Sequence, residues 1–362
     1  MPRLPSRLVA QASQRNPLLA LVLRTCRDPT SAALELKWLR DYAVQHCVHT
    51  RGNWRPLLFR LCAARSRGYP LQYLLGSEFF GDLEIKCKPG VLIPRSETAT
   101  AVTHFVNQFN PAAFNLPPRL RVLDLCTGTG CISLLFAHLF PKQRTPVKAL
   151  QIVGVDIAPE AVQLAEENRR ALLDQAAISS LQNLRYIQAD LFPPEESQQT
   201  SVPSLIGRLE ALGQLEWDVI LSNPPYISPN GFNRDTSRSV RNFEPKLALV
   251  PMAANGLADA DHGDVFYPRI LEIADQVGGK VVLLEVADLD QAERVAAMAL
   301  RYDWEGVEIW RDELFSHDDT KYIGRIRVLG TGHGRSVLCW RKAASSWLRR
   351  DGESNTTGVA SG

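Results

Sequence analysis

The sequence predicts an α/β fold in which a mostly parallel sheet, covered by helices on both faces, follows a small helical domain. Apolar residues recur at helical spacing between Asn16 and about Gly68. From residue 119 onward, short apolar runs alternate with helical segments, and a glycine-containing turn follows the first of these runs. Continuous apolar strands that alternate with helices indicate parallel strands buried on both sides.

The composition is that of an ordinary globular protein. The chain has 362 residues, 45% hydrophobic and 22% charged, which is long enough for two domains. A formal net charge of only +2 gives no overall signature of a protein that coats nucleic acid. The seven cysteines are scattered and never spaced as C-x-x-C, which argues against a disulfide framework and a zinc site. We therefore expect a reducing compartment and no metal site. We also expect no membrane span, because no apolar run approaches about 20 residues.

The first 27 residues contain five arginines and no acidic residue before Asp28, a composition typical of a mitochondrial transit peptide. We expect residues 1–16 to be such a leader, and the protein to be located in the mitochondrial matrix or otherwise in the cytoplasm. The alternative interpretation is that the segment from Pro17 onward is only a basic first helix.

The domain boundaries follow changes in pattern. Helical spacing predicts a helical domain over residues 17–68. In residues 69–98, glycine, proline and alternating apolar residues favour a hairpin that connects two domains, and the alternative is a plain connector. The α/β domain is expected to occupy residues 99–345, with a proline-rich linker at 110–118 before its first strand.

Within the α/β domain, strands and helices are expected to follow one another in a regular order. Pro159 suits the first turn of a helix, because its fixed φ is helical and its missing N–H has no partner there. We expect strands at 119–126, 151–157, 184–192, 217–225 and 278–287, and helices at 131–140, 159–175 and 267–277.

Two segments fall outside this order. Residues 193–215, which begin with a polar stretch, are expected to form a surface insertion before the strand at 217–225. Residues 346–362 end in polar and small residues and are expected to form a disordered tail.

The turn LDLCTGTGC places Asp124 at the end of the first strand, and Gly128 and Gly130 before the next helix. Glycines allow a ligand to approach the backbone, and a helix start offers unpaired N–H groups. Asp156 ends the second strand, where an acidic residue can accept hydrogen bonds from a ribose. The spacing is not G-x-G-x-x-G, which counts against a dehydrogenase, and no P-loop motif occurs. Asp124 either orients this turn or only caps the backbone.

The strand at 217–225 leads into the stretch SNPPYI. Proline cannot donate to a sheet ladder, and the residue before a proline is kept out of helical geometry, so Pro224 and Pro225 fix an extended, rigid turn. A plain strand exit is the simpler interpretation. The NPPY turn and the glycine turn nevertheless follow parallel strands and lie at the same sheet edge, which favours a site.

Six segments carry a family resemblance: PLQYLLGSEFF, LIPRSET, LDLCTGTGCISL, VDIAPEAVQLAEEN, SNPPYI and VRNFEPKLALV. In this order they resemble the class I S-adenosylmethionine-dependent methyltransferases, and most closely the PrmC/HemK-type protein-(glutamine N5) methyltransferases. The resemblance covers roughly residues 17–342 and implies a Rossmann-like, seven-stranded, mostly parallel sheet. Cys126 stands where the family frequently has glycine, and Ala287 and Asp288 stand where a glycine is expected.

The resemblance also implies the cofactor, S-adenosylmethionine, and the residues that bind it. Asp156 would bind the ribose hydroxyls, Leu191 would lie near the adenine, and Asn223 would lie beside the reacting methyl group. The methionine part would lie against Cys126, Thr127, Gly128, Thr129 and Gly130.

The resemblance assigns catalysis and substrate binding to the turn formed by Asn223, Pro224, Pro225 and Tyr226. Methyl transfer is an in-line displacement, so positioning of the nucleophile dominates. An amide nitrogen is a poor nucleophile because its lone pair is delocalised, and acceptors for both of its N–H groups favour a more pyramidal nitrogen. The Asn223 side-chain oxygen and the Pro224 carbonyl would be these acceptors. Tyr226 would pack on the amide, and Pro225 would stiffen the turn.

In the family, the substrate is the glutamine of the Gly-Gly-Gln tripeptide in class 1 peptide-chain release factors. Together with the arginine-rich leader, this implies a mitochondrial release factor as the protein partner. One alternative is an N6-adenine methyltransferase that acts on DNA or RNA; it would need a flipped base and a broad phosphate-binding surface, so nucleic acid is not the expected substrate. The other alternative is a non-catalytic S-adenosylmethionine-binding assembly factor, against which the intact NPPY turn argues.

Overall fold

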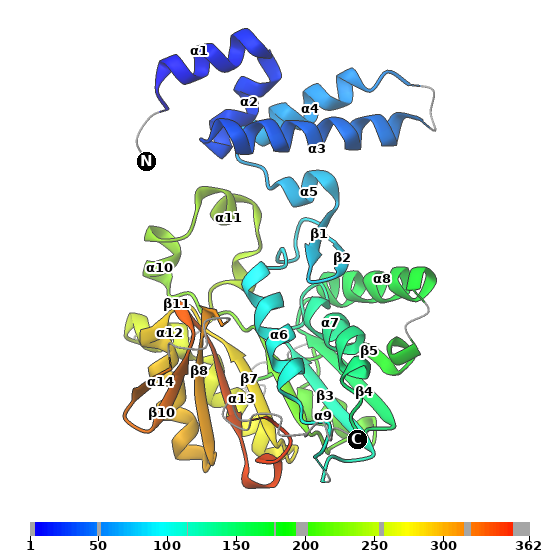
Figure 1. The fold of residues 1–362 in the computed structure, drawn as a ribbon, viewed down its shortest axis with the longest axis vertical. Helices are drawn as coiled ribbons and strands as arrows, with labels where there is room; N and C mark the ends of the chain where they lie inside the picture. The colour runs from blue at the N-terminus through cyan, green and yellow to red at the C-terminus, as the bar shows by residue number, and fades with distance from the viewer. Residues whose placement is uncertain are drawn as a thin grey trace, which may run out of the picture. The chain divides into compact units, whose positions relative to one another are not determined.

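The chain forms two compact units (Figure 1). The computed structural model describes residues 4–48, 52–113, 115–176, 179–192, 202–252, 257–314 and 320–349. The helical unit contains the described residues of Met1–Glu78, together with Lys86–Ile93 and Asn233–Pro245. The larger unit contains Phe79–Ile85, Pro94–Phe232 and the described residues from Lys246 onward.

The helical unit is built from helices that bury apolar side chains in one shared core. Leu23, Leu39 and Leu61 are buried in this core. Arg65 makes a bidentate ion pair with Glu35, at 2.6 and 2.8 Å, which connects two of the helices. The helices are α1 (Ser6–Arg15), α2 (Pro17–Cys26), α3 (Pro29–Val48), α4 (Arg55–Ser66) and α5 (Leu71–Leu75).

A segment far along the chain completes the helical unit. It contains α11 (Arg238–Phe243), in which the Ser239 hydroxyl donates to the Gly68 carbonyl at 2.6 Å. The Ile93 N–H donates to the Glu244 carboxylate at 3.1 Å. The unit is therefore larger than the segment 17–68 predicted from periodicity, because periodicity does not show which distant segments pack together. It also extends before residue 17, since α1, which lies in the predicted leader 1–16, buries Ala12 in the same core.

The predicted hairpin region, residues 69–98, contains a two-stranded sheet. It pairs β1 (Ser77–Phe80) with β2 (Leu83–Lys86) around Gly81, whose φ of 59° lies in the left-handed region. Glycine enters this region without the steric cost that a side chain imposes.

The larger unit is organised around one sheet. Its strands are β3 (Arg119–Leu125), β4 (Ala149–Asp156), β5 (Leu184–Gln188), β6 (Val219–Ser222), β7 (Val281–Glu285), β8 (Gly306–Glu313), β9 (Lys321–Ile323), β10 (Ile326–Leu329) and β11 (Thr331–Trp340). Among the described residues, nine strands follow the order β5-β4-β3-β6-β7-β11-β8-β10-β9 (Figure 1). The strands from β5 to β7 are parallel, whereas β11 is antiparallel to both of its neighbours. The mostly parallel sheet is confirmed, but the prediction of seven strands is wrong, because β10 and β9 extend the sheet beyond β8.

Helices cover both faces of this sheet (Figure 1). Consecutive strand residues point to opposite faces, so Ile220 and Leu221 of β6 belong to different apolar cores. The core on the Leu221 face contains Phe105 and Phe136, and the core on the Ile220 face contains Ile270. The helices of this unit and of the connection after β6 are α6 (Ser96–Gln108), α7 (Cys131–Leu139), α8 (Pro159–Ala176), α9 (Leu205–Ala211), α10 (Pro229–Arg234), α12 (Asp259–Asp264), α13 (Phe266–Gln276) and α14 (Leu289–Ala299). No helix within the described ranges has the length and apolarity that crossing a membrane requires.

Part of the predicted surface insertion belongs to the core. Residues 193–201 lie outside the described residues, but α9 lies within the insertion and buries Leu205 and Leu209 against the sheet. α9 is therefore a surface helix that two apolar side chains anchor to the core. The polar residues before α9 dominated the composition and hid its two apolar anchors.

The start of the predicted disordered tail is also packed. Trp347 is only 2% exposed, and its indole N–H donates to the Asn115 carbonyl at 3.2 Å. Leu348 forms an isolated β-bridge with Phe109. The prediction of disorder from residue 346 is therefore wrong at its beginning, and residues 350–362 lie outside the described residues.

Candidate active site

The strand ends that carry the predicted site residues meet at one edge of the sheet (Figure 1). Leu125 of β3 pairs with Ser222 of β6. Ser222 in turn pairs with Leu284 of β7, the residue before Glu285. Cys126 and Asn223 therefore directly follow the ends of β3 and β6, and Glu285 is the last residue of the adjacent strand β7. The Ser222 hydroxyl donates to the Leu125 carbonyl at 2.8 Å and ties the first two exits together.

The glycine turn has left-handed backbone at three positions. The φ angles are 61° at Cys126, 54° at Gly128 and 79° at Gly130. This conformation costs about 1 kcal/mol at Cys126, where a glycine would adopt it freely. A Cβ on Gly130 would collide with the Tyr186 hydroxyl, whereas a Cβ on Gly128 would meet no atom within 4 Å. Gly130 is thus required by packing, and Gly128 faces open space.

Asp124 supports this turn from the buried side. Its Oδ2 atom accepts hydrogen bonds from the Thr127 hydroxyl at 2.5 Å and from the Ser133 N–H at 3.1 Å. Its Oδ1 atom is buried and has no hydrogen-bond partner among the described residues. Burial raises the pKa of Asp124 to about 6. Of the two roles left open by the sequence, the bond to Thr127 supports orientation of the turn, and the bond to the Ser133 N–H supports capping of the backbone.

The turn is also held by a side chain of α8, the helix after β4. Thr129 is only 2% exposed, and its backbone carbonyl accepts a hydrogen bond from the Asn168 side chain at 3.0 Å. The turn is therefore fixed at both of its threonines.

Asp156 connects the end of β4 to the same turn. Its two oxygens accept hydrogen bonds from the N–H groups of Gly128, at 2.9 Å, and Ala158, at 3.0 Å. A carboxylate has about four acceptor directions, so directions remain for a pair of ligand hydroxyls. Burial raises the pKa of Asp156 above its ordinary value. Leu191, beyond β5, is buried in the core, and its carbonyl accepts from Arg269 at 2.6 Å.

The NPPY turn is rigid in the structure. Pro224 and Pro225 are buried. The Tyr226 carbonyl accepts a hydrogen bond from the Gln291 side chain at 3.2 Å, and the Ile227 N–H donates to Leu249 at 2.9 Å. The backbone is thus anchored directly after the two prolines.

Sequence reasoning missed Glu285, at the end of β7. Its carboxylate accepts hydrogen bonds from the Tyr226 hydroxyl at 3.2 Å and from the Thr98 hydroxyl at 2.5 Å. The Asn223 side-chain N–H donates in turn to the Thr98 hydroxyl at 3.4 Å. Burial raises the pKa of Glu285 to about 7. The available signal was an acidic residue ending an apolar strand, as Asp156 does.

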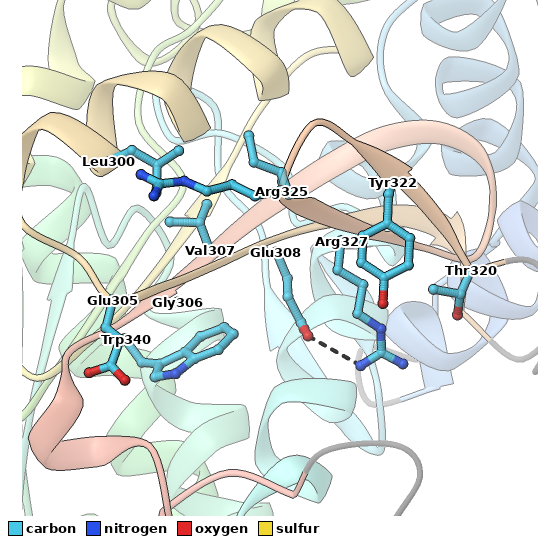
Figure 2. Close-up of a pocket in the computed structure, with 11 residues that line it drawn as sticks. Leu300, Glu305, Gly306, Val307, Glu308, Thr320, Tyr322, Arg325, Arg327 and Trp340 are labelled. Carbon is cyan, nitrogen blue, oxygen red and sulfur yellow. Dashed lines mark hydrogen bonds and ion pairs between the residues drawn. The ribbon is translucent and has the colours of Figure 1, made fainter.

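A separate cavity of about 540 Å³ opens at the opposite end of the sheet, where β8 and β10 begin and β11 ends (Figure 2). Figure 2 shows Glu308 and Arg327 pointing toward each other, and they form an ion pair at 3.3 Å. None of the predicted site residues is among the described residues that line this cavity. It is therefore not the candidate active site.

Replacing Gly130 with alanine is expected to lower the free energy of unfolding by about 1–3 kcal/mol, because the new Cβ adds a clash with Tyr186 to an unfavourable φ. Chemical denaturation of both proteins measures the difference. Gly128→Ala is the matched control: it has a similar φ but open space, so only the backbone strain of about 1 kcal/mol is expected. Equal losses in the two variants would show that the Tyr186 contact is unimportant.

A mostly parallel sheet whose edge carries a glycine turn, an acidic strand end and an NPPY turn defines a class I methyltransferase. Residues 117–202 match a family described as a methyltransferase domain. A probable mitochondrial MRF1 N(5)-glutamine methyltransferase of Schizosaccharomyces pombe is 33% identical, over 94% of this chain and 97% of that protein. The chain belongs to the release factor glutamine methyltransferase family, and the resemblance found in the motifs is confirmed.

Two further relatives agree. The mitochondrial MRF1 N(5)-glutamine methyltransferase of Saccharomyces cerevisiae is 33% identical, over 69% of this chain and 68% of that protein. A release factor glutamine methyltransferase of Pasteurella multocida is 32% identical, over 78% of this chain and 80% of that protein.

Proposed function

We propose that this chain transfers the methyl group of S-adenosylmethionine to the side-chain nitrogen, N5, of the glutamine in the Gly-Gly-Gln motif of a peptide-chain release factor. The observation that carries the proposal is the rigid NPPY turn, which shares one sheet edge with the glycine turn and Asp156. The names of the relatives support the choice of substrate, and two of them name a mitochondrial factor.

The residues at this edge fit S-adenosylmethionine, which supplies an electrophilic methyl group on a sulfonium. Asp156 would hold the ribose hydroxyls with its remaining acceptor directions. The open space at Gly128 would admit the methionine part, and the unpartnered Oδ1 atom of Asp124 supplies a buried acceptor beneath the turn. Leu191 would lie near the adenine.

The NPPY turn would prepare the nucleophile. The Asn223 side-chain oxygen and the Pro224 carbonyl would accept the two N–H groups of the substrate amide and favour a pyramidal nitrogen. Tyr226 would pack on the amide plane, held there by its hydrogen bond to Glu285. No base is required before transfer, because the nitrogen can lose its proton to water after it has become cationic.

We also propose a mitochondrial location, with residues 1–16 acting as a leader. The arginine-rich composition of the first 27 residues and the two mitochondrial relatives support it. A fluorescent protein fused to residues 1–27 is expected to enter mitochondria. Cytoplasmic fluorescence from this fusion would contradict the proposal.

The test of the proposed reaction is tritium transfer from labelled S-adenosylmethionine to a purified mitochondrial release factor. The comparison samples are the factor with Ala in place of the Gly-Gly-Gln glutamine, DNA and RNA. We expect label on the native factor and no label on the Ala variant. Label on nucleic acid would indicate an adenine methyltransferase, and no label on any sample would favour the assembly factor.

A further inference from the structure

Side chains from three separate segments form a chain of hydrogen bonds that ends on Glu285. Asn223 donates to the Thr98 hydroxyl at 3.4 Å, and Thr98 donates to the Glu285 Oε2 atom at 2.5 Å. The Tyr226 hydroxyl donates to the Oε1 atom at 3.2 Å. Thr98 is 4% exposed and Glu285 is 7% exposed, so bulk water does not replace these partners.

The direction of these bonds follows from the chemistry of a carboxylate. An ionised carboxylate only accepts hydrogen bonds, so Thr98 must direct its single proton to Glu285. The Thr98 oxygen can then only accept, and Asn223 must present its NH2 group to Thr98. The Asn223 Oδ1 atom consequently points the other way, free to accept from a substrate.

The two ends of an amide have nearly the same shape, so packing alone does not choose between them. The nitrogen of a substrate glutamine carries two N–H donors and requires acceptors. A reversed Asn223 would present donors to donors and repel this amide.

We propose that Glu285 is a positioning residue that fixes the orientation of the Asn223 amide, so that its oxygen faces the glutamine to be methylated. This inference rests on the proposed function. It assigns Thr98 the role of relaying the orientation from Glu285 to Asn223.

The surroundings of Glu285 make this orientation sensitive to pH. Burial is the largest influence and raises the pKa of Glu285 to about 7. Protonated Glu285 can donate a hydrogen bond to the Thr98 hydroxyl. The Thr98 proton is then free to be donated to Asn223, which can accept it through its side-chain oxygen. The Asn223 amide can therefore adopt the reversed orientation. Methyl transfer is therefore expected to rise with pH through an apparent pKa near 7. Two other charged groups face Glu285: Arg335 lowers its pKa, and Glu97 raises it. Cys131 and Tyr267 also face it, and the Tyr267 hydroxyl donates to the Glu285 backbone carbonyl at 3.0 Å.

The test is Glu285→Gln, which keeps the shape of the side chain but can donate to Thr98. We expect kcat for the release factor to fall about 30-fold at pH 8, with an unchanged Kd for S-adenosylmethionine and no pH dependence near 7. Glu308→Gln on β8 is the matched control, since Glu308 is a half-buried glutamate of the same sheet at its opposite end. It is expected to keep the wild-type rate and pH profile.

A second pair of variants keeps the inference testable if Glu285→Gln folds poorly. Thr98→Val removes the relaying hydroxyl and is expected to lose about as much activity, whereas Thr98→Ser keeps the hydroxyl and is expected to restore it. Equal rates for these two variants, or a wild-type rate and pH profile for Glu285→Gln, would overturn the inference. Absence of methyl transfer by the wild-type protein would refute the proposed function instead.

Discussion

Methyl transfer by the Asn223→Ala variant is expected to be about 10³-fold slower than by the wild-type protein. Alanine removes the side-chain acceptor that would orient the substrate amide, and the backbone carbonyl of Pro224 alone cannot hold both N–H groups. The Kd for S-adenosylmethionine is expected to stay within about threefold, since the glycine turn and Asp156 are untouched. Single-turnover transfer to the release factor and calorimetric titration of the cofactor measure the two quantities.

Asn230→Ala provides the control for this variant. Asn230 is an exposed asparagine seven residues further along the same connection, so its removal is expected to leave the rate unchanged. A loss of cofactor affinity as large as the loss of rate in Asn223→Ala would show that Asn223 serves the cofactor and not the nucleophile.

Asp156→Ala is expected to raise the Kd for S-adenosylmethionine about 10²-fold. Alanine removes the acceptors proposed for the ribose hydroxyls and leaves the N–H groups of Gly128 and Ala158 without their carboxylate partner. Asp156→Asn retains one oxygen acceptor, and its affinity is expected to fall between the wild-type and alanine values. Calorimetric titration at fixed pH compares the three proteins.

The control for Asp156 is Asp174→Ala on the exposed surface of α8, for which an unchanged Kd is expected. Thermal unfolding without cofactor separates a loosened turn from lost ligand contacts. If Asp156→Ala bound the cofactor as tightly as the wild-type protein, the ribose would have to be held elsewhere.

The parallel half of the sheet was predictable because its strands are continuous apolar runs. The other half, in which β11 is antiparallel to both of its neighbours, was not predictable. β11 begins with Thr331 and two glycines among polar residues, and β9 and β10 are only three and four residues long, so neither period nor length distinguishes them from loops.

Asp156 and the NPPY turn were predictable because parallel strands bring their carboxyl ends to one edge, so chain order alone brings these residues together. Glu285 ends a parallel strand and carried the same signal, but its contact with Thr98 was not predictable, because Thr98 lies 187 positions away in the chain. The contact between Ser239 and Gly68 spans 171 positions and escaped prediction for the same reason. Only the folded chain shows such pairs.

The turn at Cys126 places a sulfur nucleophile in the pocket proposed for a methyl donor, and this raises the question of self-methylation. The thiolate, not the thiol, attacks electrophiles. Burial raises the pKa of Cys126 well above its ordinary value, and the negative charges of Asp156, Asp124 and Asp190 act in the same direction. The sulfur therefore stays protonated and unreactive. Burial, and with it the acidic residues of the proposed cofactor pocket, would thus also protect the enzyme from its own reagent and leave the methyl group for the incoming glutamine.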